Sequence, residues 1–261
     1  MAGVIMTLES STRITAALLV IGDEILSGRT KDKNIGFIAE YLTAIGIELR
    51  EVRVVADEET AVIEAINALR VRNDYLFTTG GIGPTHDDIT ADCVAKALNV
   101  SIDHDPRAVA MLRERYTNPD DLNEARLRMA RIPRGALLIE NHISKAPGFM
   151  IENVIVMAGV PSIMQNMIEN VTPQLKTGLK LQSVSVDAGN LPEGQYASEL
   201  GQIQKLIPEV IIGSYPHFDG NVFRNQIVLR SRNIEQLDAA KIEIETLIAT
   251  LSKSMISKIP L

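Results

Sequence analysis

The chain has 261 residues, 46% of them apolar and 23% charged, as expected for a globular protein of one large or two modest domains. A net charge of −7 without basic patches argues against a nonspecific nucleic-acid binder. The single cysteine, Cys93, rules out an intramolecular disulfide and fits a reducing compartment. No stretch reaches the length of a membrane span, and residues 1–12 lack the basic start of a signal peptide. We therefore expect a cytoplasmic protein with a short disordered lead at 1–12.

The first part of the chain alternates strands and helices. ITAALLVI at 14–21 is a continuous apolar run, typical of a strand buried on both faces, and further strands are predicted at 47–55 and 75–79. Apolar residues at helical spacing predict helices at 35–45, at 61–69 and from about residue 89. This α/β order predicts a mostly parallel sheet with helices on both faces.

The order loosens beyond residue 100. Helices are predicted at 106–116, 120–131 and 162–175, a strand at 136–139, a polar loop at 141–149 and a hairpin within 150–157. The run Arg126–Arg134 is interrupted by apolar residues at helical spacing, which favours a solvated helix face.

A change of composition near residues 177–178 suggests a domain boundary, giving a first domain at 13–176 and a small second domain at 177–261. The second domain has predicted strands at 182–186, 210–215 and 222–230 and helices at 195–206 and 234–255. Asp219-Gly220 is a strong hairpin signal between its last two strands. The β-α-β-β-α order predicts a small α+β domain with both helices on one face of the sheet.

The strand at 75–79 leads into a glycine-rich turn, with Gly80, Gly81 and Gly83, and then into a helix. Such a junction offers free N–H groups and the positive end of a helix dipole to an anion, and glycine lets a phosphate approach the backbone. The acidic pair Asp87 and Asp88 follows, and carboxylates beside a phosphate site are best explained by a cation between them.

Three loops, 22–34, 57–60 and 80–90, should meet at the carboxyl edge of the parallel sheet, where ligands bind in such folds. They would bring Asp23, Glu24, Asp57, Asp87 and Asp88 around one glycine-lined crevice. As an alternative, Asp57 caps the helix after it and the Asp87-Asp88 pair complements a helix dipole. The pair Asp23-Glu24 has no comparable capping need.

Other motifs are absent or weaker. The sequence has no G-x-S-x-G, no Walker lysine and no G-x-G-x-x-G, which argues against serine hydrolases, P-loop kinases and nicotinamide dehydrogenases. The four histidines show no metal-ligand spacing, although His86 stands in the glycine loop and could touch a ligand. Lys145 is an exposed loop lysine or, if its loop folds over the crevice, a phosphate contact. Cys93 lies on the apolar face of its helix, as a small core residue would.

Several of these segments resemble a known family. GDEI at 22–25, TTGGIGPTHDDIT at 78–90 and APGF at 146–149 resemble motifs of the molybdopterin-binding (MoaB/MogA-like) domain, in particular its branch in the CinA proteins and in FAD synthase. GVP at 159–161 and GSYP at 213–216 are also similar to the CinA branch. The resemblance extends from about residue 14 to the end. It implies a three-layer α/β/α domain that binds a pterin or a nucleotide-like phosphate compound, followed by a small α+β domain.

The resemblance also implies site residues. Asp57 and Asp88 match the acidic residues of the family, and the phosphate loop is matched by Gly80, Gly81, Gly83 and Thr85. With the neighbouring positions, the expected site contains catalytic Asp57, Asp87 and Asp88, metal ligands Asp23, Glu24 and Asp88, and substrate or phosphate contacts from Thr79, Gly80, Gly81, Gly83, Thr85, Asn34, Lys145 and Gly148. The sequence stops at Leu261, without room for the amidohydrolase domain of CinA proteins, so nicotinamide mononucleotide deamidation is not expected.

Two functional hypotheses follow from the resemblance. In the first, the chain is a metal-dependent pyrophosphatase that cleaves ADP-ribose or FAD-like compounds with Mg²⁺, Co²⁺ or Ni²⁺. In the second, it binds molybdopterin or acts in molybdenum-cofactor biosynthesis without hydrolysis, with adenylylation of the cofactor as a variant. The expected partners are a small nucleotide or pterin and further copies of this chain in a homo-oligomer, and not nucleic acid or a membrane.

Overall fold

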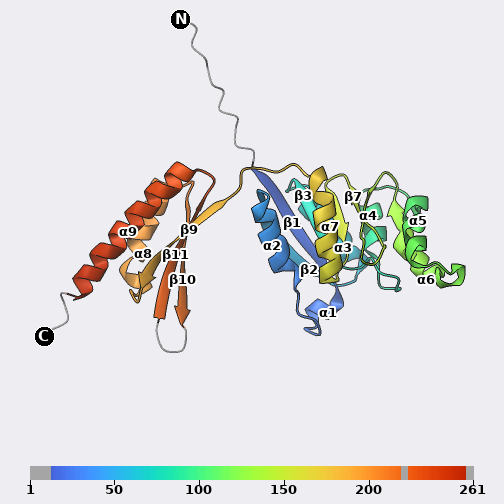
Figure 1. Cartoon of the computed structure of the whole chain (residues 1–261), viewed down its shortest axis with the longest axis horizontal. Helices are drawn as coiled ribbons and strands as arrows, with labels where there is room; N and C mark the ends of the chain where they lie inside the picture. The colour runs from blue at the N-terminus through green and yellow to red at the C-terminus, as the bar shows by residue number, and fades with distance from the viewer. Residues whose placement is uncertain (1–12, 219–222, 257–261) are drawn as a thin grey trace, which may run out of the picture. The chain divides into compact units, whose positions relative to one another are not determined.

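The computed structural model describes residues 13–218 and 223–256, and these fall into two compact units divided between Gly178 and Leu179 (Figure 1). The sequence placed this boundary between 176 and 177. The lead at 1–12 and the Asp219-Gly220 turn lie outside the described residues. No helix within the described ranges has both the length and the apolar character needed to cross a membrane.

The first unit is built on a six-stranded sheet with the order β2-β1-β3-β8-β7-β6. The first four of these strands run parallel to one another, β7 is antiparallel to β8, and the edge strand β6 is antiparallel to β7. The mostly parallel sheet expected from the sequence is therefore confirmed. The strands are β1 (Ile14–Ile21), β2 (Ile47–Val55), β3 (Tyr75–Thr79), β6 (Leu137–Ile139), β7 (Gly148–Ile151) and β8 (Val154–Met157).

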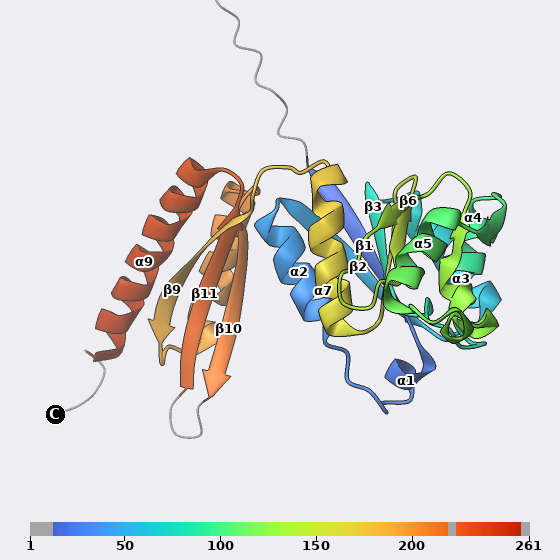
Figure 2. The ribbon, with the colours of Figure 1, turned by 45° about the vertical axis from the view of Figure 1, so that its right-hand side comes forward.

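Helices cover both faces of this sheet. Figure 2 shows α2 (Asn34–Ala44) and α7 (Pro161–Val171) on one face, with α3 (Glu59–Arg70), α4 (Thr90–Ala97) and α5 (Pro106–Arg115) on the other. Alternate residues of β1 enter two separate cores because side chains alternate along a strand. Ala16, Leu18 and Val20 pack with α2 and α7, whereas Ala17, Leu19 and Ile21 pack with the opposite helices.

The region between α4 and β7 differs most from the sequence prediction. The helix expected at 120–131 is divided into a 3₁₀ turn at 119–121, the short α6 (Glu124–Leu127), a second 3₁₀ turn at 128–130 and the strand β5 (Arg131–Pro133). β5 pairs antiparallel with another strand that was not predicted, β4 (Ile102–His104). The apolar spacing indicated a buried face but could not reveal this long-range pairing. The predicted loop 141–149 is also shorter, because β7 begins at Gly148.

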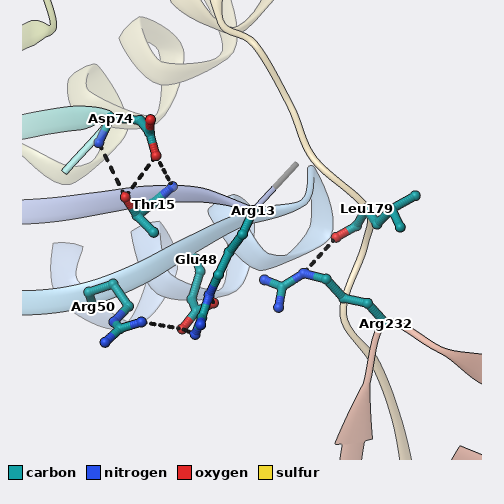
Figure 3. A network of polar contacts seen from close by, with 7 residues as sticks. All are labelled: Arg13, Thr15, Glu48, Arg50, Asp74, Leu179 and Arg232. Atoms are coloured by element: carbon teal, nitrogen blue, oxygen red, sulfur yellow. Dashed lines mark hydrogen bonds and ion pairs between the residues drawn. The ribbon is translucent and has the colours of Figure 1, made fainter. Parts of the chain in front are cut away.

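The start of β1 is held by polar contacts at the sheet edge opposite the carboxyl ends of the strands (Figure 3). The backbone N–H and hydroxyl of Thr15 both donate to Asp74 Oδ2, at 2.7 and 2.8 Å. Arg13 pairs with Glu48 on the neighbouring β2, at 2.5 Å. These contacts fix the registers of β1 relative to β2 and β3, and hence the positions where the strands end.

The second unit is the predicted β-α-β-β-α domain. Its antiparallel sheet has the order β10-β11-β9, and its helices share one core with the sheet, so they cover the same face. On the long helix the buried Leu237, Ala240, Ile244 and Ile248 recur at helical spacing. Just before this long helix, the Arg232 side chain donates a hydrogen bond to the carbonyl of Leu179 (Figure 3). The elements are β9 (Gln182–Gly189), α8 (Ala197–Leu206), β10 (Ile211–Phe218), β11 (Phe223–Ser231) and α9 (Ile234–Ile256).

Candidate functional site at the carboxyl edge of the sheet

The glycine turn after β3 has a backbone that only glycine accommodates. Gly80 and Gly81 have φ angles of +100° and +64°, in the region that L side chains rarely adopt. A Cβ on Gly80 would lie 2.1 Å from the carbonyl oxygen of Ile21, and one on Gly81 would lie 2.2 Å from Thr90 Oγ1. Thr90 begins α4 and ties the turn to it, since its hydroxyl donates to Gly80 O and its N–H to Gly81 O, each at 2.9 Å.

The turn presents backbone donors. The Gly80 N–H donates a hydrogen bond to the Met157 carbonyl of β8, at 3.2 Å. Among the described residues, the next three N–H groups, of Gly81, Ile82 and Gly83, have no hydrogen-bond acceptor. Successive N–H groups in such a turn form a binding concavity for an anion. The glycine turn expected from the sequence is therefore present, and phosphate binding to it remains a prediction.

The Asp88 carboxylate stabilises the second half of this loop by hydrogen bonds. Its Oδ2 accepts hydrogen bonds from the N–H of Thr85, at 2.8 Å, and from the Thr85 hydroxyl, at 2.5 Å. A Cβ on Gly83 would lie 2.7 Å from the same oxygen, so the carboxylate lies directly over Gly83. Asp88 thus lies at the glycine turn, and its hydrogen bonds are to the turn itself. Asp87 points outward, with 60% of its side chain exposed, and His86 beside it is 99% exposed.

Asp57 lies where the loops after β1 and β2 meet. Its Oδ2 accepts a 2.9 Å hydrogen bond from the backbone N–H of Asp23, at the start of the short α1 (Asp23–Leu26). The capping alternative for Asp57 is wrong, because the residue before α3 is Glu58 and no side chain caps that helix. Asp57 instead holds the beginning of α1.

The charges around Asp57 show that the acidic loops converge. Burial raises the pKa of the Asp57 carboxyl above its ordinary value, and the N–H of Asp23 acts in the opposite direction. The carboxylates of Asp23, Glu24 and Asp87 raise this pKa further. These three side chains come from two other loops, so they lie close enough to Asp57 to repel its negative charge.

The described residues do not form a ready-made metal cage. Within 13–218 and 223–256, no three His, Cys, Asp or Glu side chains are grouped so that they could hold a metal ion. Of the predicted ligands, Asp88 already has its carboxylate on Thr85, and the Glu24 carboxylate folds over Gly22, 2.6 Å from where a Cβ would stand. A cation bound by Asp23, Glu24 and Asp88 remains a prediction.

An open cleft lies on the α2 and α7 side of the glycine turn. Its walls include Thr79 and Gly80 from β3 and the turn, Asn34 from α2, Gly159 after β8, and Glu24, Lys31 and Lys33 from the loop before α2. Asn34 Nδ2 donates to the Gly159 carbonyl at 2.8 Å, which joins α2 to the β8–α7 loop. The predicted contacts Thr79, Gly80 and Asn34 are thus brought together.

A smaller hollow on the α4 side contains an arginine that the sequence prediction placed elsewhere. Arg128 lines it with Gly81, Gly83 and Asp88, and its guanidinium donates to the Asp88 carbonyl at 3.3 Å. Arg131, on the same wall, forms an ion pair with Asp92. The run Arg126–Arg134 is therefore not simply a solvated helix face, because part of it is 3₁₀ turn and strand beside the glycine loop.

Two predicted ligand contacts have other partners. Lys145, in the left-handed region with φ 62°, forms a 2.6 Å ion pair with Glu114. It lines a hollow with Glu140 and His142 that does not include the glycine turn. Gly148 is buried at the start of β7, where a Cβ would lie 2.4 Å from the Val156 carbonyl. Close strand packing therefore explains this glycine, and contact of either residue with a ligand remains a prediction.

Comparisons with known proteins agree with the fold. Residues 17–177 match the family described as "Probable molybdopterin binding domain", and residues 181–256 match the "FAD synthase, middle domain". The chain belongs to the first of these families, and its small second unit is similar to the second. This confirms the resemblance drawn from GDEI, TTGGIGPTHDDIT and APGF.

The similar proteins include one from Pyrobaculum aerophilum, 32% identical over 255 residues, which cover 94% of each chain. A protein of Pyrobaculum arsenaticum is 33% identical over 77% of this chain and 79% of its own. Among solved structures, the protein CinA from Thermoplasma acidophilum, described as of unknown function, is 33% identical with a TM-score of 0.59. That similarity covers 63% of this chain and 99% of the CinA chain.

Proposed function

We propose that the first unit binds the pyrophosphate group of a nucleotide derivative, such as ADP-ribose or FAD, at the glycine turn and hydrolyses it. The proposal is supported by the positions of two features, the N–H groups of the glycine turn and the carboxyl of Asp57. The N–H groups of Gly81 to Gly83, which have no acceptor within the described part of the chain, and the partly desolvated carboxyl of Asp57 lie at the same edge of the sheet. The first can hold a phosphate and the second can take a proton from water.

The chemistry assigned to Asp57 is general-base catalysis. A base works best when its pKa is near the operating pH, and both burial and neighbouring carboxylates move the pKa of Asp57 in that direction. The Asp23 N–H fixes one carboxyl oxygen, which leaves the other free to orient a water molecule. The water oxygen attacks phosphorus, its proton passes to Asp57, and the bond to the bridging oxygen breaks. From ADP-ribose the products are AMP and ribose 5-phosphate.

An acidic site must offset the charge of its anionic ligand. The turn N–H groups contribute, and Lys31 and Lys33 stand on the wall of the adjoining cleft. Because the described residues provide no preformed cage, a cation would arrive with the phosphates, as Mg²⁺ commonly does with one or two protein carboxylates. Metal dependence is therefore part of the experiment.

The second candidate is a molybdopterin-binding protein without hydrolase activity. It is favoured by the family description of residues 17–177. The same turn N–H groups would hold the single terminal phosphate of the pterin, and Asp57 would then have no catalytic role.

The two candidates are separated by a product assay. The protein is incubated with ADP-ribose, FAD and ATP, each without metal and with Mg²⁺, Co²⁺ or Ni²⁺, and AMP is measured. We expect AMP from ADP-ribose or FAD, which contain an internal pyrophosphate. Absence of AMP under every metal, together with tight binding of molybdopterin, would overturn the hydrolase and establish the second candidate.

A further inference from the structure

Two buried polar atoms beside the glycine turn lack hydrogen-bond partners. Asn34 is 4% exposed and Thr79 is 1% exposed, and both line the cleft on the α2 side of the turn. Among the described residues, neither Asn34 Oδ1 nor Thr79 Oγ1 has a hydrogen-bond partner. An unmade bond at a buried polar atom costs about 1–3 kcal/mol, so such a pair in a cleft indicates atoms that a ligand completes.

The orientation of the Asn34 amide is fixed by its surroundings. Its Nδ2 donates to the Gly159 carbonyl at 2.8 Å, and a flipped amide would place two oxygen atoms against each other. Its own N–H donates to Asp32 Oδ1 at 3.0 Å, which holds the residue at the first position of α2. The unpaired atom is therefore an acceptor held in place by the fold.

An unpaired amide oxygen selects the chemistry of its partner. It accepts a hydrogen bond from N–H or O–H but repels an ionised phosphate, which offers only acceptors. A sugar hydroxyl or the N–H of a heterocycle satisfies it. The Thr79 hydroxyl can donate or accept, so it can pair with a second hydroxyl of the same ring.

We infer that the cleft lined by Asn34 and Thr79 is the subsite for the donor-bearing part of the ligand, its ribose or base, while the phosphates bind at Gly81 to Gly83. The inference rests on the proposed function, because it assumes a nucleotide-like ligand at this edge. It narrows the prediction for Asn34 and Thr79 from substrate or phosphate contacts to sugar or base contacts.

Thr78 provides a matched control on the same strand. It is also fully buried, and its hydroxyl also has no partner among the described residues. Because side chains alternate along β3, it points to the opposite face of the sheet and does not line the cleft. Thr78→Val and Thr79→Val remove the same unpaired hydroxyl, so both should leave the melting temperature equal or higher than that of the wild type.

The test measures equilibrium binding with Mg²⁺ of two ligands that cannot be hydrolysed, α,β-methylene-ADP-ribose and methylenediphosphonate. Thr79→Val and Asn34→Ala should each weaken binding of the nucleotide analogue by about 2- to 10-fold, the range for one hydrogen bond. Methylenediphosphonate should bind all variants like the wild type, and Thr78→Val should bind both ligands normally.

Two results would overturn the inference. If the wild type binds the analogue and Thr79→Val and Asn34→Ala bind it equally well, the subsite is not there. If both variants lose methylenediphosphonate binding to the same extent, the cleft holds phosphate instead. A wild-type protein that binds neither ligand would refute the proposed function itself, and the inference with it.

Discussion

The backbone N–H of Asp23 and the carboxylate of Asp57 are joined by a 2.9 Å hydrogen bond, although the residues are 34 positions apart. The contact links the ends of β1 and β2, which are neighbours in the sheet. It places the acidic loop after β1 over the residue that we assign as the base. A bond that serves only structure would tolerate any acceptor at position 57, whereas catalysis requires a carboxylate.

Asp57→Asn separates these two roles. Asparagine keeps an oxygen that can accept from Asp23 N–H but cannot take a proton from water. Turnover should fall by about 10²- to 10⁴-fold, the usual contribution of a general base. The melting temperature should stay level or rise, because the variant removes a charge that burial and neighbouring carboxylates disfavour. AMP release and thermal unfolding are the measurements.

The control is Asp103→Asn, which changes a carboxylate on β4 that is 95% exposed. A near-normal rate of AMP release for Asp57→Asn would contradict the assignment of Asp57 as the base.

Replacing Gly80 or Gly36 with alanine should change the free energy of unfolding in opposite directions. Gly80→Ala places a Cβ against the Ile21 carbonyl at a φ of +100°, so the free energy of unfolding should fall by about 2 kcal/mol or more. Gly36→Ala, within α2, meets no atom within 4 Å and should raise it by about 0.5–1 kcal/mol. Urea titrations measure both. Equal changes in the free energy of unfolding for the two variants would show that Gly80 does not have the strained backbone and the close contact with Ile21 described above.

Much of this site could be predicted because its signals are local. A continuous apolar run marked β1 as a buried strand, and the rule that ligands bind at the carboxyl ends of parallel strands brought Asp23 and Asp57 together. Arg128 could not be predicted, because its position depends on 3₁₀ turns and on the pairing of β4 with β5. The unpaired oxygen of Asn34 was equally hidden, since it depends on a hydrogen bond to Gly159, 125 positions away.

The pH dependence of stability should include a contribution from Asp105, which caps α5. A hydrogen bond from the Arg107 side chain holds the pKa of this carboxyl below its ordinary value of 3.8, while burial opposes the shift. A lowered folded-state pKa means stabilisation that is present above 3.8 and is lost as the pH falls through the folded-state value. Asp105→Asn keeps a cap acceptor, so the wild type should be the more stable at neutral pH and the difference should vanish in acid. A difference that grows in acid would contradict this sign.

Cys93 should be chemically inert in the folded protein. It is fully buried in α4, and burial raises the pKa of its thiol to about 11. At neutral pH it should resist alkylation by iodoacetamide and react once denaturant unfolds the chain, as mass spectrometry can follow. Rapid labelling of the native protein would show that α4 opens and, with it, the glycine turn anchored by Thr90.

Phosphate binding at the turn after β3 can be observed in the backbone N–H resonances of the turn. We predict that α,β-methylene-ADP-ribose with Mg²⁺ shifts the ¹H–¹⁵N signals of Gly81, Ile82 and Gly83, while the signal of Gly201 in the second unit stays in place. Unchanged turn signals at a ligand concentration that shifts resonances elsewhere would contradict it.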